Sequence, residues 1–200
     1  MSATAEQIKK LRELTGAGVL DSKKTLEEHN GDFDAALAIL KEKGLKAAAK
    51  KVERVAKQGL IETYVHAGGR MGVIAEINCE TDFVAATNEF KELAHNVALQ
   101  IVATNPKYVS KEDVPASLVE EQKKLFADAA AAEGKPAHII EKIVTGKLES
   151  FYKDSCLLLQ PFIRDDKRTV NDLVQATITI LGENIVIRRF TRFELGETQG

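Results

Sequence analysis

A pattern of alternating apolar residues ends at Cys79, and a helical pattern follows it. Residues two apart face the same side of an extended chain, which predicts a half-buried strand with this inward face: Met71, Val73, Ala75, Ile77 and Cys79. Beyond the turn, apolar residues recur every three or four positions, which predicts a helix from about residue 83 to 103 with this stripe: Phe90, Leu93, Ala94, Val97, Ile101 and Val102. We therefore expect a strand-to-helix corner at residues 78–85.

The turn at this corner contains Thr81, Asp82 and Phe83, and it permits two interpretations. In the first, Thr81 or Asp82 caps the helix and Phe83 packs against a nearby apolar residue at the helix entry. In the second, Phe83 projects outward beside a carboxylate, because a short connection cannot easily bury an aromatic ring when the helix stripe begins several residues later. Helix caps are commoner than functional turns, so the residues alone favour the first interpretation.

Three short helices are predicted before the basic segment that begins near residue 41. Thr4 and Gln7 form a capping box for the first helix, and the second is expected to be capped by Asp21 and Ser22. The third is expected to end at Gly44. The apolar faces of the first and third helices are Ile8, Leu11 and Leu14, and Phe33, Ala36, Leu37 and Leu40. These helices predict a small N-terminal bundle near the lower size limit for independent folding.

Basic residues are concentrated between positions 41 and 57, where only Glu42 and Glu53 are acidic. We predict a basic helical linker here. It could contact phosphates, but it lacks the clustered aromatic residues that stack on bases, which favours a solvated helix face. A nucleic-acid-binding or adaptor module that uses residues 41–57 is the alternative function.

The rest of the chain predicts an α+β core with an antiparallel sheet, because strands are few, helices are many, and their order is not strictly βαβ. The expected elements are a β-hairpin at 60–66 and 71–79 around a glycine turn at 67–70, the helix at 83–103, helices near 118–129 and 136–151, an extended apolar segment at 157–162, a helix at 170–181 and a strand at 185–195. His66 lies at the tip of the hairpin. In the last strand the alternation slips at Arg188 and Arg189, which predicts a β-bulge.

The sequence lacks a recognisable set of residues for covalent chemistry, metal binding or nucleotide binding. Cys79, His66 and Asp82 could be drawn as a triad, but Cys79 lies on the inward face of its strand, where a thiol is usually inert. The histidines are isolated, the two cysteines are far apart, and no glycine motif continues as Gly-Lys-Ser or Gly-Lys-Thr. We therefore expect no enzyme activity, no cofactor, no metal and no bound nucleotide.

The composition is that of an ordinary soluble protein, with 44% hydrophobic and 29% charged residues. A net charge of -2 creates no overall field that would attract nucleic acid or a membrane surface. No apolar run is long enough for a secretory signal or a membrane span. We expect a cytoplasmic protein.

Four segments of the chain together match the motifs of a known family. They are residues 15–24 (Thr-Gly-Ala-Gly-Val-Leu-Asp-Ser-Lys-Lys), 79–85 (Cys-Glu-Thr-Asp-Phe-Val-Ala), 160–162 (Gln-Pro-Phe) and 182–190 (Gly-Glu-Asn-Ile-Val-Ile-Arg-Arg-Phe). Each segment alone is a weak signal, but four in this order, between about Ile8 and Gly196, are highly specific. The chain resembles the bacterial elongation factor Ts family, whose members catalyse guanine-nucleotide exchange on elongation factor Tu during translation.

The resemblance implies a two-part chain that binds elongation factor Tu. Residues 1–54 would form a helical module similar to ubiquitin-associated domains, and residues 55–200 would form the α+β core. The module would dock on the GTPase domain of the partner through these positions: Val19, Leu20 and Lys23. The core would direct the turn from Thr81 to Val84 toward the partner's magnesium and phosphate side, with Asp82 and Phe83 as the intruding residues. For Phe83, the resemblance therefore favours the outward interpretation.

The resemblance is to short members of the family, which have one hairpin-and-helix unit where longer members have a second unit and a coiled-coil insertion. A short member is expected to complete its core as a homodimer, with Phe83 from one subunit and the hairpin tip near His66 from the other. One position departs from the family pattern, because Ala86 stands where a basic residue is common. The uncharged Ala86 side chain therefore cannot make the charge contact that a basic residue would make at this position.

Overall fold

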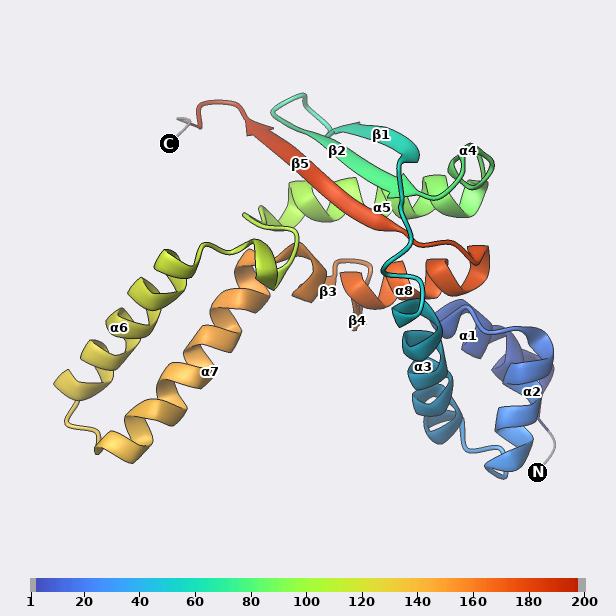
Figure 1. The fold of residues 1–200 in the computed structure, drawn as a ribbon, viewed down its shortest axis with the longest axis horizontal. Coiled ribbons are helices and arrows are strands. Elements are labelled where there is room, and N and C mark those ends of the chain that lie inside the picture. Colours follow the sequence, from blue (N-terminus) through green and yellow to red (C-terminus); the bar gives the residue numbers. More distant parts are fainter. Residues whose placement is uncertain (1–2, 198–200) are drawn as a thin grey trace. The chain divides into compact units, whose positions relative to one another are not determined.

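The computed structural model describes residues 3–197, apart from the side chains at positions 45 and 47–49. Its elements are α1 (Ala5–Thr15), α2 (Val19–Glu28), α3 (Phe33–Ala49), β1 (Gln58–Val65), β2 (Met71–Cys79), α4 (Asp82–Ala85), α5 (Asn88–Thr104), η1 (Lys111–Asp113), α6 (Ala116–Ala132), α7 (Ala137–Ser155), η2 (Leu157–Leu159), β3 (Pro161–Phe162), β4 (Asp165–Thr169), α8 (Val170–Leu181) and β5 (Val186–Glu194), as labelled in Figure 1. The α+β class is confirmed. The described backbone divides into two compact units, one that combines residues up to 99 with those from 171, and one of residues 100–170.

Helices α1–α3 pack around a small apolar core in the first unit. Its fully buried members are Leu11, Leu26, Ala36 and Leu40. Helix α1 begins at the predicted capping box, in which the Gln7 N–H donates to the Thr4 hydroxyl at 3.2 Å. The helix ends at Gly16, which adopts the left-handed conformation with φ of 69°.

Two boundaries in this module differ from the sequence prediction. Helix α2 begins at Val19, so Asp21 and Ser22 lie inside its first turn and do not cap it. An acidic residue in the first turn still interacts favourably with the positive end of the helix dipole. Helix α3 continues through Gly44 to Ala49, because the alanines and lysines after Gly44 are strong helix formers.

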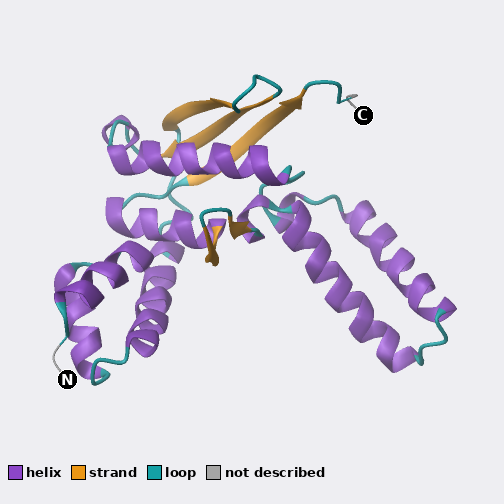
Figure 2. Cartoon of the chain, turned by 180° about the vertical axis from the view of Figure 1, so that it is seen from behind, coloured by secondary structure: helices purple, strands orange, loops and turns teal. Residues whose placement is uncertain are grey.

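The sheet of the first unit has the strand order β1-β2-β5, and both pairs are antiparallel. Four of the five predicted inward residues of β2 are buried and Met71 is half-buried, whereas the other face carries half-exposed side chains such as Ile74. The register between β2 and β5 shifts between Glu76 and Ile77, which leaves Arg188 as the extra residue of the predicted bulge. Figure 2 shows α5 along one face of this sheet, so the buried faces of β2 and α5 belong to one core.

The helix predicted from about residue 83 to 103 is interrupted, and this prediction is wrong in its first part. The chain forms the short helix α4 and then, after Ala86 and Thr87, the longer helix α5. Thr87 separates them because its hydroxyl donates to the Val84 carbonyl at 2.7 Å and accepts the Phe90 N–H at 3.3 Å. The apolar stripe of α5 is nevertheless buried as predicted.

The second unit contains α6 and α7, which Figure 1 shows side by side around a turn at Gly134. Residues 157–159 are not extended as predicted but form the short 3-10 helix η2. This turn lets the Leu157 N–H donate to the Tyr108 carbonyl at 2.9 Å and the Leu158 N–H donate to the Val109 carbonyl at 3.0 Å. Gln160, the first residue of the Gln-Pro-Phe motif, accepts hydrogen bonds through Oε1 from the Gln100 amide and the Thr104 hydroxyl. The motif therefore has a structural role in this unit.

Candidate functional site

Residues 80–85, called the corner turn below, present an exposed aromatic ring at the end of β2. The Phe83 side chain is 83% exposed, and Asp82 beside it is exposed as well. Thr81 caps α4, because its hydroxyl accepts the Val84 N–H at 3.3 Å. The capping half of the first interpretation is thus confirmed, but Phe83 does not staple the helix. The ring faces solvent, as the resemblance implied.

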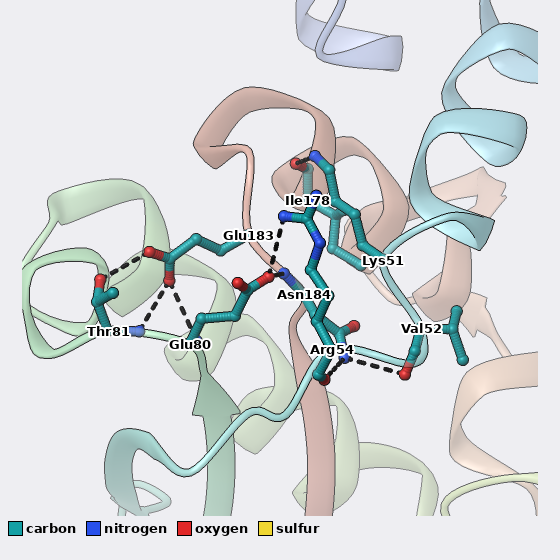
Figure 3. Close-up of polar contacts among 8 residues, drawn as sticks. All are labelled: Lys51, Val52, Arg54, Glu80, Thr81, Ile178, Glu183 and Asn184. Atoms are coloured by element: carbon teal, nitrogen blue, oxygen red, sulfur yellow. Dashed lines mark hydrogen bonds and ion pairs between the residues drawn. The ribbon is translucent and has the colours of Figure 1, made fainter.

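The corner turn is held by carboxylates from two segments far apart in sequence (Figure 3). Glu183 accepts the backbone N–H groups of Glu80 at 3.1 Å and Thr81 at 3.0 Å, and the Thr81 hydroxyl at 2.7 Å. In return, the Glu80 carboxylate accepts the backbone N–H of Asn184 at 2.7 Å. Hydrogen bonds to ionised acceptors are stronger than neutral ones, so this exchange fixes the backbone that carries Phe83.

The linker after α3 joins the same set of contacts (Figure 3). The side-chain amide of Asn184 donates to the carbonyls of Val52 at 3.4 Å and Arg54 at 2.9 Å. Lys51 donates to the Ile178 carbonyl at 3.4 Å. Segments 51–54, 80–81 and 183–184 therefore form one polar cluster.

Cys79 is buried directly below the corner turn, and its thiol donates to the Thr81 carbonyl at 3.1 Å. Burial raises the pKa of the Cys79 thiol, and the nearby Glu183 carboxylate adds to the increase. A protonated thiol is a poor nucleophile. His66 precedes β2 while the corner turn follows it, and a rise of about 3.3 Å per residue puts these ends roughly 26 Å apart. The triad drawn from Cys79, His66 and Asp82 therefore does not form.

The three predicted docking residues of the N-terminal module lie together on α2. Leu20 is 81% exposed and Val19 is 49% exposed, both in the first turn after Gly18. Lys23 follows Val19 by four residues on the same helix face, and its Nζ lies 3.8 Å from Glu27 Oε1. The module thus presents two apolar side chains and a cation to solvent, an arrangement suited to binding a protein surface.

His66 is exposed at the tip of the hairpin, where its backbone N–H donates to the Met71 carbonyl at 2.9 Å. Its ring lies beside Tyr64, with the phenolic oxygen 3.1 Å from Nδ1. Within one chain, His66 and Phe83 are thus at opposite ends of β2.

The predicted helical linker at residues 41–57 is helical only as far as Ala49. A turn at residues 50–54 and an irregular segment at 55–57 complete it, because the Asn184 and Lys51 contacts hold residues 51–54 in the polar cluster. Part of its charge is already paired, since Lys46 Nζ lies 2.6 Å from Glu42 Oε1.

The sequence did not point to Glu80, Glu183 or Asn184 as individual site residues. Their roles depend on the pairing of β2 with β5, in which Asn78 is opposite Val186. This pairing brings the end of β2 to the start of β5. An available signal was a glutamate directly after the helix-ending Gly182, at the edge of a predicted strand.

These features define a class of protein that acts by binding another macromolecule. The ring of Phe83 and the apolar pair on α2 are exposed, and across residues 3–197 no cluster of three or more His, Cys, Asp or Glu side chains could hold a metal ion. None of the helices in the described part of the chain is long and apolar enough to cross a membrane.

Comparison with known proteins identifies the family. The family model "Elongation factor TS" matches residues 1–197. The chain is 55% identical over 194 residues to elongation factor Ts of Thermoanaerobacter sp., covering 97% of this chain and 95% of the relative. It is 56% identical over 194 residues to that of Caldanaerobacter subterraneus, with 97% of both chains covered, and 54% identical over 197 residues to that of Coprothermobacter proteolyticus, with 98% and 100% covered. The chain belongs to the elongation factor Ts family, the nucleotide exchange factors of elongation factor Tu.

Proposed function

We propose that this protein promotes GDP release from elongation factor Tu by inserting the corner turn near the magnesium and phosphate side of the nucleotide pocket. The observation that carries the proposal is the exposure of Phe83 on a turn whose backbone is fixed by Glu183 and Glu80. Asp82 adds a carboxylate beside the ring, and its negative charge would disturb the groups that surround the magnesium ion. The protein would need no covalent chemistry of its own.

The energetics require more than the corner turn. An exchange factor is an allosteric ligand. If it weakens the affinity of elongation factor Tu for GDP, then bound GDP must weaken the affinity of elongation factor Tu for the exchange factor by the same factor. A ten-thousand-fold effect needs about 5.5 kcal/mol of differential binding. Burying the Phe83 ring contributes roughly 1.5–3 kcal/mol. We therefore propose that the N-terminal module, residues 1–54, docks on the GTPase domain and that the core, residues 55–200, contributes the remainder.

The test of the corner turn is Phe83→Ala, measured by release of fluorescent GDP from elongation factor Tu in a stopped-flow instrument. At saturating protein we expect the release rate to fall roughly 10- to 150-fold, which corresponds to the loss of the burial energy of the ring. The complex should still form, because the α2 contact remains. Leu125→Ala removes an exposed apolar side chain from α6 and serves as the control, with an unchanged rate expected. Wild-type release rates for Phe83→Ala would refute the assigned role.

The test of docking is Val19→Asp, measured by calorimetric titration against nucleotide-free elongation factor Tu. A buried charge would oppose the apolar contact, so we expect at least a tenfold weaker complex. Lys24→Ala is the matched control, because Lys24 is exposed on the same helix about 140° from Val19. Equal affinities for Val19→Asp and wild type would show that α2 is not the docking surface. Salt-sensitive RNA binding through residues 41–57, with no effect on GDP release, would instead favour the adaptor alternative.

We also propose that two copies pair through the outward face of the sheet. This face carries exposed apolar side chains from all three strands: Ile61, Val65, Ile74 and Phe193. A two-fold contact pairs the same patch on both copies. If the β2 strands run in opposite directions, the hairpin tip at His66 of one copy approaches the corner turn of the other.

Sedimentation velocity tests this pairing. We expect a dimer for the wild type and a monomer for Ile74→Lys, which places a charge at the centre of the outward face. Lys9→Glu, a change at an exposed position of α1, should leave the dimer intact. A wild-type monomer at working concentrations would count against the proposal.

A further inference from the structure

Helix α4, which carries Phe83, is too short to fix its own orientation. It has only four residues, and none of the residues described in it is buried. A helix this short is unstable without external contacts, because few hydrogen bonds offset the cost of ordering its backbone. Whatever fixes the direction of the Phe83 ring must therefore lie outside α4.

Glu183 makes three hydrogen bonds to the segment that leads into α4, in addition to the packing of α4 against β1 and β2. Its Oε2 atom accepts the Glu80 and Thr81 N–H groups at 3.1 and 3.0 Å, and its Oε1 atom accepts the Thr81 hydroxyl at 2.7 Å. The third contact has a further effect on α4. A threonine hydroxyl has a single hydrogen, and donating it to Glu183 leaves the oxygen lone pairs available to the Val84 N–H, which lies 3.3 Å away. The cap of α4 is thus oriented by Glu183 through Thr81.

The position of Glu183 is itself well determined. It follows Gly182, which ends α8 in the left-handed conformation with φ of 77°. It precedes Asn184, which is buried and bonded to Glu80 through its N–H and to the Arg54 carbonyl through its side chain. Glu183 therefore connects the corner turn to a segment that is anchored on both sides.

We propose that Glu183 is a positioning residue for nucleotide exchange, which sets the direction in which α4 presents the Phe83 ring. The inference rests on the proposed function of the corner turn. Glu183 does not need to touch elongation factor Tu, and it acts through Thr81 and the backbone at residues 80–81. It should therefore govern the rate of GDP release in the complex, while the N-terminal module governs how tightly the complex forms.

The experiment is Glu183→Gln, assayed by stopped-flow release of fluorescent GDP over a range of factor concentrations. Glutamine keeps the shape of the side chain, but an NH2 group replaces one acceptor and faces N–H donors. We expect the plateau rate to fall about tenfold or more, since charge-assisted hydrogen bonds are lost, and the half-saturating concentration to stay within about twofold. Glu149→Gln, the same change at an exposed position of α7, should match wild type.

A second arm separates positioning from general destabilisation. In a Phe83→Ala background, Glu183→Gln should lower the plateau rate by less than about threefold, because the ring that Glu183 directs is absent. Amide hydrogen exchange at Thr81 and Val84 should become faster in Glu183→Gln, and the amides of α1 should be unchanged. If melting shows that Glu183→Gln is unfolded, Glu183→Asp, which is one methylene shorter, replaces it in every assay with the same expectations.

The outcomes distinguish this inference from the function on which it rests. A wild-type protein that fails to accelerate GDP release would defeat the proposed function. Wild-type acceleration, a slow Phe83→Ala and an unaffected Glu183→Gln would overturn only the positioning role. An undiminished tenfold loss in the Phe83→Ala background would overturn it as well, because Glu183 would then act independently of the ring.

Discussion

The contact between the N-terminal module and α8 makes a quantitative prediction for Gly16→Ala. Gly16 ends α1 with φ of 69°, and its N–H donates to the Arg12 carbonyl at 2.8 Å. A Cβ atom at this position would lie 2.4 Å from the Ala176 carbonyl oxygen and 3.0 Å from Ile180 Cγ1. The oxygen belongs to the backbone of α8 and cannot move away as a flexible side chain would. The substitution must therefore separate α1 from α8.

The expected cost has two parts. A left-handed conformation costs a residue with a Cβ atom about 1–2 kcal/mol. Overpacking against a fixed neighbour costs about 1–3 kcal/mol more. The free energy of unfolding of Gly16→Ala should therefore fall by about 2–5 kcal/mol relative to wild type.

Gly134→Ala is the matched control, because it separates the two parts. Gly134 has nearly the same φ, 73°, but a Cβ atom there would have no neighbour within 4 Å among the described residues. It should lose only the conformational part, about 1–2 kcal/mol. Urea denaturation followed by far-ultraviolet circular dichroism measures both variants. Equal losses for Gly16→Ala and Gly134→Ala would refute the close approach of α1 to α8.

Four further predictions concern the N-terminal core, the polar cluster and the buried thiol of Cys79. Leu11→Ala, at a fully buried position of the N-terminal module, should lower the free energy of unfolding by about 2–5 kcal/mol in urea denaturation, and a loss below about 1 kcal/mol would contradict the packing. Asn184→Ala leaves the Arg54 carbonyl without its side-chain donor, so amide exchange in residues 51–54 should accelerate, and unchanged exchange would show that Asn184 does not anchor the linker. Burial raises the pKa of the Cys79 thiol, so iodoacetamide should modify Cys79 far more slowly in native than in urea-unfolded protein, and equal rates would refute its burial. The thiol of Cys79 holds its proton more tightly in the native state than in the unfolded state. Its contribution to the stability of the native state is therefore present at neutral pH and should be lost as pH rises above roughly 8.5, which a falling urea midpoint would show.

Local patterns predicted most elements of this chain because they arise from neighbouring residues. The alternation in β2 and the stripe of α5 follow from fixed repeats of side-chain direction, and both buried faces were predicted. The capping box at Thr4 needs only residues three apart. The errors occurred where local signals conflicted, as at Gly44, where the helix formers that follow outweigh one glycine. Thr87 similarly divides the helix expected from residue 83 through contacts with both sides.

The candidate site was predicted only in part. Its motif identified Thr81, Asp82, Phe83 and Val84 by resemblance, but the residues alone favoured a ring packed at the helix entry. Exposure of the ring depends on whether an apolar partner packs against it, and the ring is 83% exposed on a helix in which no described residue is buried. Sequence spacing carries no information about this contact.

By itself, the sequence determined where most strands and helices form, which faces are apolar and which family the motifs resemble, because all of these depend on short-range order along the chain. Only the tertiary structure decided what holds the corner turn. Glu183 lies 102 residues from Thr81, and the hydrogen bond between them exists because β5 pairs with β2 in one particular register. Such pairings are selected by the packing of the whole unit, so no local pattern encodes them.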